Sequence, residues 1–377
     1  MKILICVRRL DKGGAELLEC RLAQNLNEMG VHTDLAGQYD KNQFDGAVCA
    51  AKWNESGVPK IVWLKSNQSF GVLVAIVRLI RIIWNNRYDV IISHHSGLDI
   101  IAGAACFLTR TKHVAAFHDY FYKEQIGKFR ILIWRSILSK ASVTYCISNY
   151  VKHNIQTILN VNEKNNRTIY NSIETPVLKR DAIKNIRQEL NLAQDTKLIL
   201  SSGRVNFNKG FDLSILVLKD LLLKGNNYLL IMGGASNKAE DDYLRSLMDL
   251  VTREGLSTHV LFLGYRKEAF AILQQSNVYI HMARHEGFGL VLTEAIAAGV
   301  PIVASNAGGI PEVLSGTSYT AFSLMDKTGI VNEVTRFLAL SAESKKELTD
   351  KATDVLPFYT DKRRAQEVKK MLEEIVV

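Results

Sequence analysis

The stretch VYIHMARHEGFGLVLTEAIAAGVPIVAS, residues 278–305, decides the fold because it contains one complete strand–helix–strand unit. Its first apolar run, 278–281, predicts a strand, and the apolar pattern after a glycine-bracketed turn predicts a helix of about ten residues. Gly299 is expected to end this helix in the left-handed conformation, with Pro301 just beyond it. The run 302–304 predicts a second strand, and this order is typical of a parallel sheet covered by helices.

The same alternation extends along the whole chain. Further strands are predicted at 2–7, 31–36, 90–93, 113–117, 143–147, 198–202, 228–232 and 260–263. Helical patterns lie between them, and a charged amphipathic helix is predicted at 361–375. The polar stretch 171–185, which contains Pro176, separates two such series. We therefore expect an α/β protein of two doubly wound, Rossmann-like domains joined by a hinge at 171–185.

Length and composition agree with a two-domain globular protein. The chain has 377 residues, of which 47% are hydrophobic and 23% charged, values that are ordinary for soluble domains. No apolar run approaches the roughly 18 residues that a membrane-spanning helix needs. The start, MKILICVRR, continues directly into strand-like sequence, so no signal peptide is expected. The five cysteines are scattered without C-x-x-C spacing, which indicates reduced thiols and a cytoplasmic protein.

The net charge of +9 favours an anionic partner such as a nucleotide, an anionic lipid or a nucleic acid. A nucleic acid is the least favoured of these, because the basic residues are not interleaved with aromatic ones as stacking grooves require. Two segments, 70–87 and 128–140, combine cations with Trp84 and Trp134 on helical patterns. They predict peripheral binding to the anionic inner face of the cytoplasmic membrane, although crossover helices that bury an apolar stripe would show the same pattern.

Ligands of doubly wound sheets bind beyond the carboxyl ends of the strands, so the informative residues should lie in the loops there. The first such loop contains Gly13 and Gly14 immediately before a helix. It lacks the G-x-G-x-x-G spacing of a dinucleotide site, and without that spacing Asp34 is a weak match to the site's ribose-binding acid. The glycine pair allows a phosphate or a sugar to approach backbone amides closely, or it forms only a tight turn.

The loop GRVNFNKG, residues 203–210, follows the first strand of the second domain. It brings Arg204 and Lys209 to the carboxyl end of that strand. Two cations can neutralise a diphosphate there, arginine through its planar fork and lysine as a point charge. The alternative is a pair of solvated surface cations, and the position in the fold favours the diphosphate site.

The glycine-bracketed turn of the opening stretch predicts an anion site. The amides of Phe288, Gly289 and Leu290 would lie at the positive end of the helix that follows. Glu294 lies one turn deeper on the same face as Leu290, where its carboxylate can accept hydrogen bonds from a ribose diol. Glu286, at the strand end, would point toward the group that the diphosphate carries. In the alternative interpretation, one glutamate caps the helix and the other faces solvent.

His118 and Asp119 follow a strand of the first domain. A single histidine is more often structural than catalytic, and Asp119 could cap the next helix. The pair His94-His95 ends another strand, but it lacks a third ligand at useful spacing, so no metal site is expected. No D-x-D motif occurs, and the run 240–242 is typical of the acidic first turn of a helix.

Together these motifs resemble the retaining glycosyltransferases of family 4, which have the GT-B fold. The matching pieces, in chain order, are KGGAE at 12–16, HD at 118–119, YCISNYVK at 145–152, IYNSIE at 169–174, GRVNFNKG at 203–210, the glutamates Glu286 and Glu294 of an E-x7-E motif, and GGIPEV at 308–313. Each piece alone is weak, whereas their order and spacing cover essentially the whole chain.

The resemblance implies two domains that face each other across a cleft. The first, residues 1–172 with a returning C-terminal helix at 358–377, would bind the acceptor. The second, residues 186–357, would bind a nucleotide-diphosphate sugar.

By position, the resemblance also gives each candidate residue a role. Arg204 and Lys209 would hold the diphosphate. Glu294 would bind the ribose, Glu286 would contact the donor sugar, and His118 would lie near the hydroxyls of the transferred sugar. The further donor-binding positions are Gly13, Gly14, Gly264, Tyr265, Phe288, Gly289 and Leu290. No metal or other cofactor is expected, because in this family cations and helix amides stabilise the departing diphosphate.

The implied reaction transfers a hexose-type sugar, with retention of configuration, to a saccharide or a lipid-linked acceptor in the synthesis of cell-surface polysaccharide or lipopolysaccharide. No carboxylate nucleophile is evident, so we expect same-face attack, with an oxygen of the leaving phosphate taking the acceptor proton. Three departures from the family pattern are Ser172 in place of a hinge glycine, 233–235 in place of a spaced glycine pair, and Tyr265-Arg266, which do not identify the base. A uridine nucleotide is favoured over a guanosine nucleotide.

Two alternatives stay open. A sugar-nucleotide epimerase on the same fold would use the diphosphate site without an acceptor. A non-catalytic subunit that binds sugar nucleotides would more readily have lost Glu286 or Lys209, and both are present.

Overall fold

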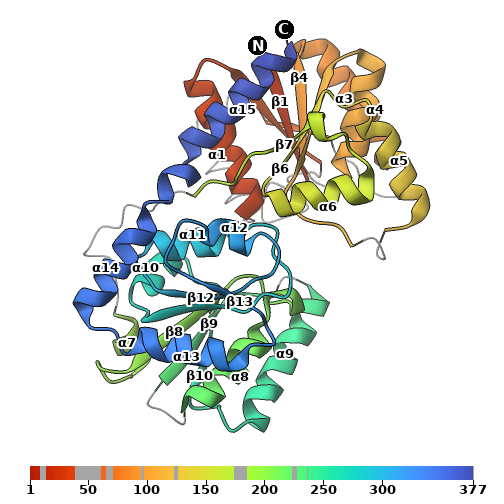
Figure 1. Ribbon diagram of the computed structural model, residues 1–377. Coiled ribbons are helices and arrows are strands. Elements are labelled where there is room, and N and C mark those ends of the chain that lie inside the picture. The colour runs from red at the N-terminus through yellow and green to blue at the C-terminus, as the bar shows by residue number, and fades with distance from the viewer. Residues whose placement is uncertain are drawn as a thin grey trace. The chain divides into compact units, whose positions relative to one another are not determined.

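The computed structural model describes residues 1–8, 14–38, 61–64, 71–94, 97–122, 126–173, 185–222, 227–235 and 237–376. The chain divides into two compact units (Figure 1): unit 1 comprises Met1–Ser172 and Phe358–Val377, and unit 2 comprises Ile173–Pro357. Each unit has its own parallel sheet covered by helices, so the prediction of two doubly wound α/β domains is confirmed. Most of the predicted hinge lies outside the described residues.

The described residues of unit 1 form a seven-stranded parallel sheet in the order β3-β2-β1-β4-β5-β6-β7. Its strands are β1 Lys2–Val7, β2 His32–Gly37, β3 Ile61–Trp63, β4 Val90–His94, β5 Lys112–Phe117, β6 Val143–Cys146 and β7 Asn166–Thr168. Its helices are α1 Gly14–Glu28, α3 Gly71–Asn86, α4 Leu98–Thr109, α5 Lys128–Leu138, α6 Asn149–Leu159 and α15 Asp361–Val376, with the 3₁₀ turn η3 at Glu163–Asn165. The strand order reverses between β1 and β4, which makes the carboxyl ends of these strands the topological switch point of unit 1.

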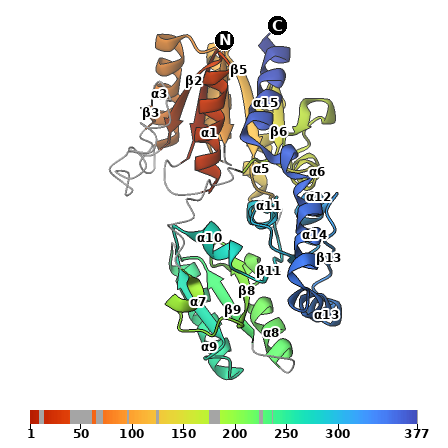
Figure 2. The same cartoon turned by 90° about the vertical axis from the view of Figure 1, so that its left-hand side faces the viewer.

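Alternate residues of β1 face opposite sides of this sheet. Ile3, Ile5 and Val7 are buried in one apolar cluster with residues of α1 and α15, and Leu4 and Cys6 are buried in a second cluster with residues of α3 and α4. Figure 1 shows these two helix pairs on opposite faces, and in Figure 2 the face with α1 and α15 is turned toward the viewer. Burial on both faces explains why β1 is a continuous apolar run.

Helix α15 comes from the end of the chain but packs on α1. Arg364 Nη2 donates a hydrogen bond to Glu19 Oε1 at 2.6 Å, and both side chains are buried. At the start of α15, Asp361 accepts a hydrogen bond from Ser172 Oγ at 2.5 Å and forms an ion pair with Arg21 Nε at 3.0 Å. Ser172, which stands in place of the hinge glycine, is the last residue before unit 2. Its hydroxyl therefore connects the end of this segment to the helix that follows unit 2.

The described residues of unit 2 form a six-stranded parallel sheet in the order β10-β9-β8-β11-β12-β13. Its strands are β8 Lys197–Ser202, β9 Asn227–Met232, β10 Val260–Gly264, β11 Val278–His281, β12 Ile302–Ser305 and β13 Ala321–Phe322. Its helices are α7 Ile186–Glu189, α8 Phe211–Leu222, α9 Lys238–Arg253, α10 Ala269–Gln274, α11 Leu290–Ala297, α12 Ile310–Leu314, α13 Lys327–Leu338 and α14 Ala342–Thr353, with the 3₁₀ turns η5 at Phe207–Lys209 and η6 at Leu356–Tyr359. The switch point of this unit lies between β8 and β11.

Every predicted strand is present, with its ends within one residue of the predicted ones. Gly299 follows α11 with φ +67°, in the predicted left-handed conformation, and Glu240 and Asp241 lie in the first turn of α9. Strands β3, β7 and β13 were not predicted, because two or three residues are too few to show a periodic pattern.

Candidate functional site

The candidate site lies at the switch point of unit 2, in the loops that follow β8 and β11. These loops pack tightly against each other. Gly210 has φ +65°, and a Cβ atom there would lie 1.8 Å from the carbonyl oxygen of Met282, so only glycine fits. The amide of Arg284 donates a hydrogen bond to the carbonyl of Asn208 at 2.8 Å. Each loop therefore holds the other in place.

Three side chains from this edge of the sheet form a charged cluster. Lys209 Nζ lies 2.5 Å from Glu286 Oε2, and His281 Nε2 lies 3.1 Å from the same oxygen. Burial alone would raise the pKa of Glu286, but the charge of Lys209 and the hydrogen bond from His281 lower that pKa to about 2. Glu286 is therefore ionised at physiological pH. Burial lowers the pKa of His281, so its ring is neutral and donates to the carboxylate through Nε2.

Arg204 lies at the start of the same loop as Lys209. Its side chain is 66% exposed, and its Nε atom lies 3.8 Å from Glu240 Oε1. At this distance, with the guanidinium exposed to solvent, the attraction to the buried Glu240 contributes little free energy. The guanidinium can therefore turn toward a ligand at the carboxyl end of β8 at little cost.

A side-chain clamp holds the turn η5, which carries Lys209. Arg284 donates to both carboxylate oxygens of Asp212 at 2.8 and 2.6 Å, and Tyr243 donates to the same carboxylate at 2.8 Å. The Arg284 guanidinium also lies 3.9 Å from the centre of the Phe207 ring. The planar guanidinium makes both contacts at once. Sequence reasoning missed Arg284, whose one available signal was its place in the loop after β11.

Helix α11 begins at the glycine-bracketed turn. Gly289, directly before it, has φ +101°. The segment GGIPEV supports this turn: the amide of Gly309 donates to the carbonyl of Glu286 at 2.9 Å, and a Cβ atom at Gly308 would lie 2.0 Å from that carbonyl oxygen. The backbone of Glu286 is thus anchored just before the positive end of α11, where a helix favours negative charge.

Glu294 is exposed on α11, although Leu292 and Ala295 beside it are buried. Tyr279 of β11 indicates where its carboxylate lies. Burial is the main cause that raises the pKa of the Tyr279 hydroxyl, and the charges of Glu294 and Glu286 raise it further. Both carboxylates therefore act on a hydroxyl that contacts Ser202, the last residue of β8.

The predicted base-side segment follows β10. Gly264 ends this strand with φ +64°, and the next residue, Tyr265, is exposed. Arg266 forms ion pairs with Glu189 and Glu268 at 2.8 and 2.6 Å. These pairs occupy the Arg266 guanidinium, whereas the Tyr265 ring is accessible to a ligand.

The other predicted donor-binding residues are divided between the units. Phe288 is buried, and Leu290 is the first residue of α11. Gly14 is the first residue of α1 in unit 1, and Gly13 lies outside the described residues.

Unit 1 contains a second cluster, which the sequence did not predict. Glu19 Oε2 lies 2.9 Å from His94 Nε2, Glu19 Oε1 lies 3.3 Å from His118 Nε2, and His94 Nδ1 lies 2.7 Å from His118 Nε2. Sequence reasoning considered only the adjacent pair His94-His95, whereas the structure brings Glu19 and His118 to His94. His95, the other member of the adjacent pair, lies outside the described residues. No sequence spacing connects a residue of α1 with the ends of β4 and β5.

Two acids of unit 1 differ from the roles considered for them. Asp119 accepts a hydrogen bond from the amide of Tyr120, and the next helix among the described residues begins only at Lys128, so the cap interpretation was wrong. Asp34 is buried and accepts a hydrogen bond from Tyr88 at 2.6 Å. It is therefore a core residue.

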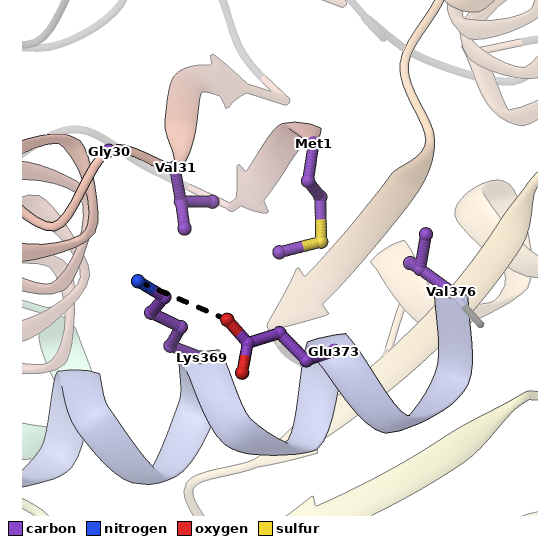
Figure 3. Close-up of a pocket in the computed structure, with 6 residues that line it drawn as sticks. All are labelled: Met1, Gly30, Val31, Lys369, Glu373 and Val376. Atoms are coloured by element: carbon purple, nitrogen blue, oxygen red, sulfur yellow. Dashed lines mark ion pairs between the residues drawn. The ribbon is translucent and has the colours of Figure 1, made fainter.

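A pocket in unit 1 lies at the end of the strands opposite to the switch point (Figure 3). It is lined by Met1, Gly30, Val31, Lys369, Glu373 and Val376, and Lys369 Nζ lies 3.9 Å from Glu373 Oε1 along α15. Met1 precedes β1 and Val31 precedes β2, so the pocket lies at the amino ends of the strands. Doubly wound sheets bind their ligands at the carboxyl ends, and this pocket is therefore no candidate for the donor site.

Family models match both halves of the chain. Residues 12–176 match the model described as Glycosyltransferase Family 4, and residues 182–355 match the model described as Glycosyl transferases group 1. The first match falls in unit 1 up to the region of the hinge, and the second extends over nearly all of unit 2.

Two curated relatives are also sugar transferases by name. An uncharacterized glycosyltransferase of Methanocaldococcus jannaschii is 26% identical over 61% of this chain and 60% of its own length. The lipopolysaccharide 1,2-N-acetylglucosaminetransferase of Salmonella typhimurium is 31% identical over 47% of this chain and 48% of its own length. This chain thus spans about half to three fifths of the length of these relatives.

A solved structure matches over both units. The crystal structure of Anabaena HepE in complex with UDP has a TM-score of 0.85 at 20% sequence identity, and the match covers 99% of this chain and 100% of that chain. At this level of identity the likeness shows the fold, which is GT-B. With each half matched to its own glycosyltransferase model on this fold, the chain is a GT-B protein of the family 4 and group 1 glycosyltransferase type.

Proposed function

We propose that this chain transfers a hexose-type sugar from a nucleotide-diphosphate sugar, with a uridine nucleotide favoured, to a saccharide or a lipid-linked acceptor. The process would be the synthesis of cell-surface polysaccharide or lipopolysaccharide at the cytoplasmic side of the membrane. The observation that carries the proposal is the cluster of Lys209, Glu286 and His281 at the switch point of unit 2. The name of the Salmonella relative, which acts on lipopolysaccharide, and the UDP in the Anabaena structure support the acceptor and donor classes.

The diphosphate of the donor is assigned to the loop after β8. The ammonium group of Lys209 has three N–H donors, and the contact with Glu286 uses one of them. The other donors, together with the exposed fork of Arg204, can bind phosphate oxygens. The positive end of α11 adds to the same favourable potential.

The two glutamates are assigned to neutral parts of the donor. Glu286 is ionised, so it can only accept hydrogen bonds, and sugar hydroxyls are suitable donors. Glu294, exposed on α11, has the same capacity toward the ribose diol. Tyr265 offers an exposed ring beside which a base can stack. Gly13 and Gly14 of the first loop stay predicted contacts of the donor.

The proposed reaction retains configuration at the anomeric carbon. The acceptor oxygen forms its bond to that carbon on the face from which the diphosphate leaves, the bond from carbon to phosphate oxygen breaks, and the acceptor proton passes to the leaving phosphate. Arg204 and Lys209 stabilise the negative charge that grows on the diphosphate. Because these cations take the role of a metal ion, the proposal requires no metal or other cofactor. His118 is assigned to the hydroxyls of the transferred sugar.

Melting temperatures with UDP, GDP, ADP and CMP test the donor class. A ligand at ~100 times its dissociation constant adds ~2.7 kcal/mol to the free energy of unfolding. We expect a clear rise with UDP and little change with the other three. A larger rise with GDP would overturn the assignment of the base.

Product analysis separates the transferase from its alternatives. A transferase forms a glycoside when donor and acceptor are both present. An epimerase converts the sugar nucleotide when no acceptor is added. A protein that binds UDP but converts no sugar nucleotide under either condition is a non-catalytic binding subunit, and that outcome contradicts the proposal.

We also propose that α3, α4 and α5 of unit 1 bind an anionic membrane surface. Large apolar side chains are exposed on these helices: Val72, Leu73, Val77, Trp84, Phe107, Leu108, Phe129 and Leu132. Burial of an apolar stripe accounts for Ala75, Leu79 and Ile83 of α3, but it does not account for the exposed set. Cations lie among the exposed rings: the charged group of Lys140 lies 4.0 Å from the centre of the Phe107 ring. Exposed apolar groups with neighbouring cations favour an anionic lipid surface.

Co-sedimentation with vesicles tests this membrane contact. Among the described residues, no helix has the length and apolar content to cross a bilayer. We expect binding to anionic vesicles at low salt, weaker binding to neutral vesicles, and a loss of binding in Trp84→Ser and Phe129→Ser. A protein that stays entirely in the supernatant with anionic vesicles contradicts the proposal.

A further inference from the structure

A buried polar network connects four elements near the switch point of unit 1. His94 is the last residue of β4, His118 follows β5, Glu19 lies on α1, and Arg364 lies on α15. The side chains of Glu19, His94 and Arg364 are at most 2% exposed, and that of His118 is 6% exposed. Solvent therefore contributes little to this network, and its charges and hydrogen bonds must be satisfied from within.

The charges of the network compensate each other. Arg364 Nη2 donates to Glu19 Oε1 at 2.6 Å. Burial alone would raise the pKa of Glu19, but Arg364 and His94 hold that pKa well below its usual range, so Glu19 is an anion. Burial lowers the pKa of His118 to about 4, against the opposing effect of Glu19. At physiological pH the His118 ring is therefore neutral and adds no charge to the ion pair of Glu19 and Arg364.

The hydrogen bonds allow only one tautomer of His118. A carboxylate accepts hydrogen bonds and cannot donate them, and Glu19 Oε1 lies 3.3 Å from His118 Nε2, so this nitrogen carries the proton. His94 Nδ1, 2.7 Å from the same proton-bearing nitrogen, then acts as an acceptor. His94 Nε2 lies 2.9 Å from the other oxygen of Glu19, at ion-pair distance. The contact of Glu19 with Nε2 therefore leaves Nδ1 of His118 as the unprotonated acceptor.

Nδ1 of His118 is buried and has no hydrogen-bond partner among the described residues. A buried acceptor without a protein partner is unfavourable, so the group that satisfies it must be a water molecule or a ligand. The hydroxyl group of a sugar is a neutral donor and would satisfy it, whereas phosphate oxygens offer acceptors only. We infer that Glu19 is a positioning residue that holds His118 with Nδ1 as the acceptor for a hydroxyl of the bound sugar. This inference rests on the proposed glycosyltransferase function.

A metal site is the rival interpretation of the same atoms. Glu19, His94 and His118 each offer one ligand atom, and these atoms lie within 4.8 Å of one another. Arg364 already compensates the one carboxylate, so a divalent ion would leave two positive charges without counter-charges in buried surroundings. It would also lie next to a guanidinium group. The charges therefore favour a closed hydrogen-bond network, and zinc binding becomes an outcome of the test.

Nuclear magnetic resonance of protein with ¹⁵N-labelled histidine reports the tautomer directly. In the wild-type protein we expect one tautomer of His118, with Nε2 protonated and Nδ1 unprotonated. Glu19→Gln replaces a carboxylate oxygen with an NH₂ donor, which requires one imidazole to accept instead of donate, so the single tautomer should be lost. Glu28→Gln, an exposed position on the same helix, is the matched control and should keep the wild-type spectrum.

A double variant separates positioning from folding. Glu19→Gln alone leaves Arg364 buried without a counter-charge, which is strongly destabilising. Glu19→Gln with Arg364→Met removes both charges, and we expect this protein to fold and to show the same loss of tautomer. Its kcat for sugar transfer should fall by roughly tenfold or more, with a smaller change in the donor KM. A folded double variant that keeps the wild-type tautomer, or one with normal kcat, overturns the inference.

Ligand titrations distinguish a failure of this inference from a failure of the proposed function. If no nucleotide raises the melting temperature, the proposed function fails, whatever the tautomer of His118. If UDP binds, the UDP-sugar that supports transfer should shift the His118 Nδ1 resonance and UDP alone should not. An unchanged Nδ1 resonance overturns the sugar contact. Zinc chloride alone should change nothing, and a stoichiometric shift of the His94 and His118 signals that a chelator reverses would overturn the closed network.

Discussion

In the proposed reaction Lys209 and Glu294 would bind the same substrate in different ways, because only Lys209 would face a charge that changes during the reaction. Lys209 already holds an anion, Glu286, at 2.5 Å in the free protein. In the proposed reaction the diphosphate gains negative charge as its bond to the sugar breaks, so the interaction with Lys209 strengthens in the transition state. The ribose stays uncharged throughout the reaction. Glu294 should therefore stabilise the bound substrate and the transition state equally.

The first prediction concerns this uniform binding. Glu294→Gln should raise the donor KM more than it lowers kcat, because one acceptor of the ribose diol is replaced by a donor. The lost binding free energy should be on the order of 1 to 3 kcal/mol. Steady-state kinetics with varied donor measure both constants. Glu343→Gln, at an exposed position in the first turn of α14, serves as a comparison outside the ribose contact. A Glu294→Gln enzyme with normal KM and reduced kcat would contradict the ribose assignment.

Asp99 makes the stability of unit 1 depend on pH. It is fully buried on α4 and accepts a hydrogen bond from Ser93 Oγ at 2.7 Å. Burial raises its pKa from the ordinary 3.8 to about 8. Because the folded protein holds this proton more tightly, the contribution of Asp99 to stability is fully present below the ordinary pKa and is lost as pH rises toward about 8.

The second prediction is that Asp99→Asn removes this dependence. Between about pH 4 and 8, the free energy of unfolding of the wild type should fall relative to the variant by up to about 1.4 kcal/mol per pH unit. Tryptophan fluorescence during denaturation measures the free energy of unfolding of unit 1, because all four tryptophans of the chain lie within residues 1–172. His113, whose burial lowers its pKa to about 4, is present in both proteins and its opposite effect cancels. Parallel curves for wild type and Asp99→Asn would show that Asp99 ionises normally.

Among the elements of unit 2, the turn η5 depends on Arg284, a side chain to which no contact with the donor is assigned. Arg284 links η5 to α8 and α9 through Asp212 and Tyr243 and covers the ring of Phe207. Lys209 is the last residue of this turn. The position of its ammonium group is therefore set by a clamp and not by the loop sequence alone.

The third prediction follows from this clamp. Arg284→Ala should lower kcat/KM by roughly tenfold or more, because supporting groups of a reactive side chain commonly have effects of this size. Arg245→Ala, which breaks an exposed ion pair with Asp242 on α9, is the matched control and should leave activity unchanged. Circular dichroism verifies the fold of both variants. Equal activities of the two variants would mean that η5 is rigid without Arg284.

Most elements of the fold could be predicted because buried parallel strands are apolar throughout and their helices show a clear period. The candidate residues Arg204, Lys209 and Glu286 were predictable for a related reason. They follow β8 and β11, and the switch point makes the ends of these strands neighbours. Short strands such as β3 were missed because their length gives no periodic signal.

The missed site residues share a different cause. His281 ends β11 and reads as a part of an apolar strand. Glu19 reads as a part of an amphipathic helix, and its partner Arg364 is 345 residues away in the chain. A local pattern cannot show a contact between the first helix and the last. Such pairs emerge only when the fold is known.

At the scale of the whole molecule, the same topology recurs in both units with a similar consequence. In unit 2 the switch point holds the ion pair of Lys209 and Glu286 with His281. In unit 1 the corresponding region holds the ion pair of Glu19 and Arg364 with two histidines. Each unit thus has a charged network at the edge where its fold admits a ligand. The proposed catalysis, however, depends on the network of unit 2.

In the proposed catalysis the loop after β8 stabilises charge on the departing diphosphate. The most direct test of this role is kcat for Lys209→Ala and Arg204→Ala with the true donor and acceptor. Lys219→Ala, at an exposed lysine of α8 paired with Glu254, provides the control for a lost surface cation. Both loop variants should remain folded by circular dichroism and should lose roughly a hundredfold or more in kcat, as enzymes do when one preorganised charge-stabilising donor is removed. The control should keep wild-type kcat. Folded Lys209→Ala and Arg204→Ala enzymes with near-normal kcat would show that this loop does not carry the chemistry assigned to it.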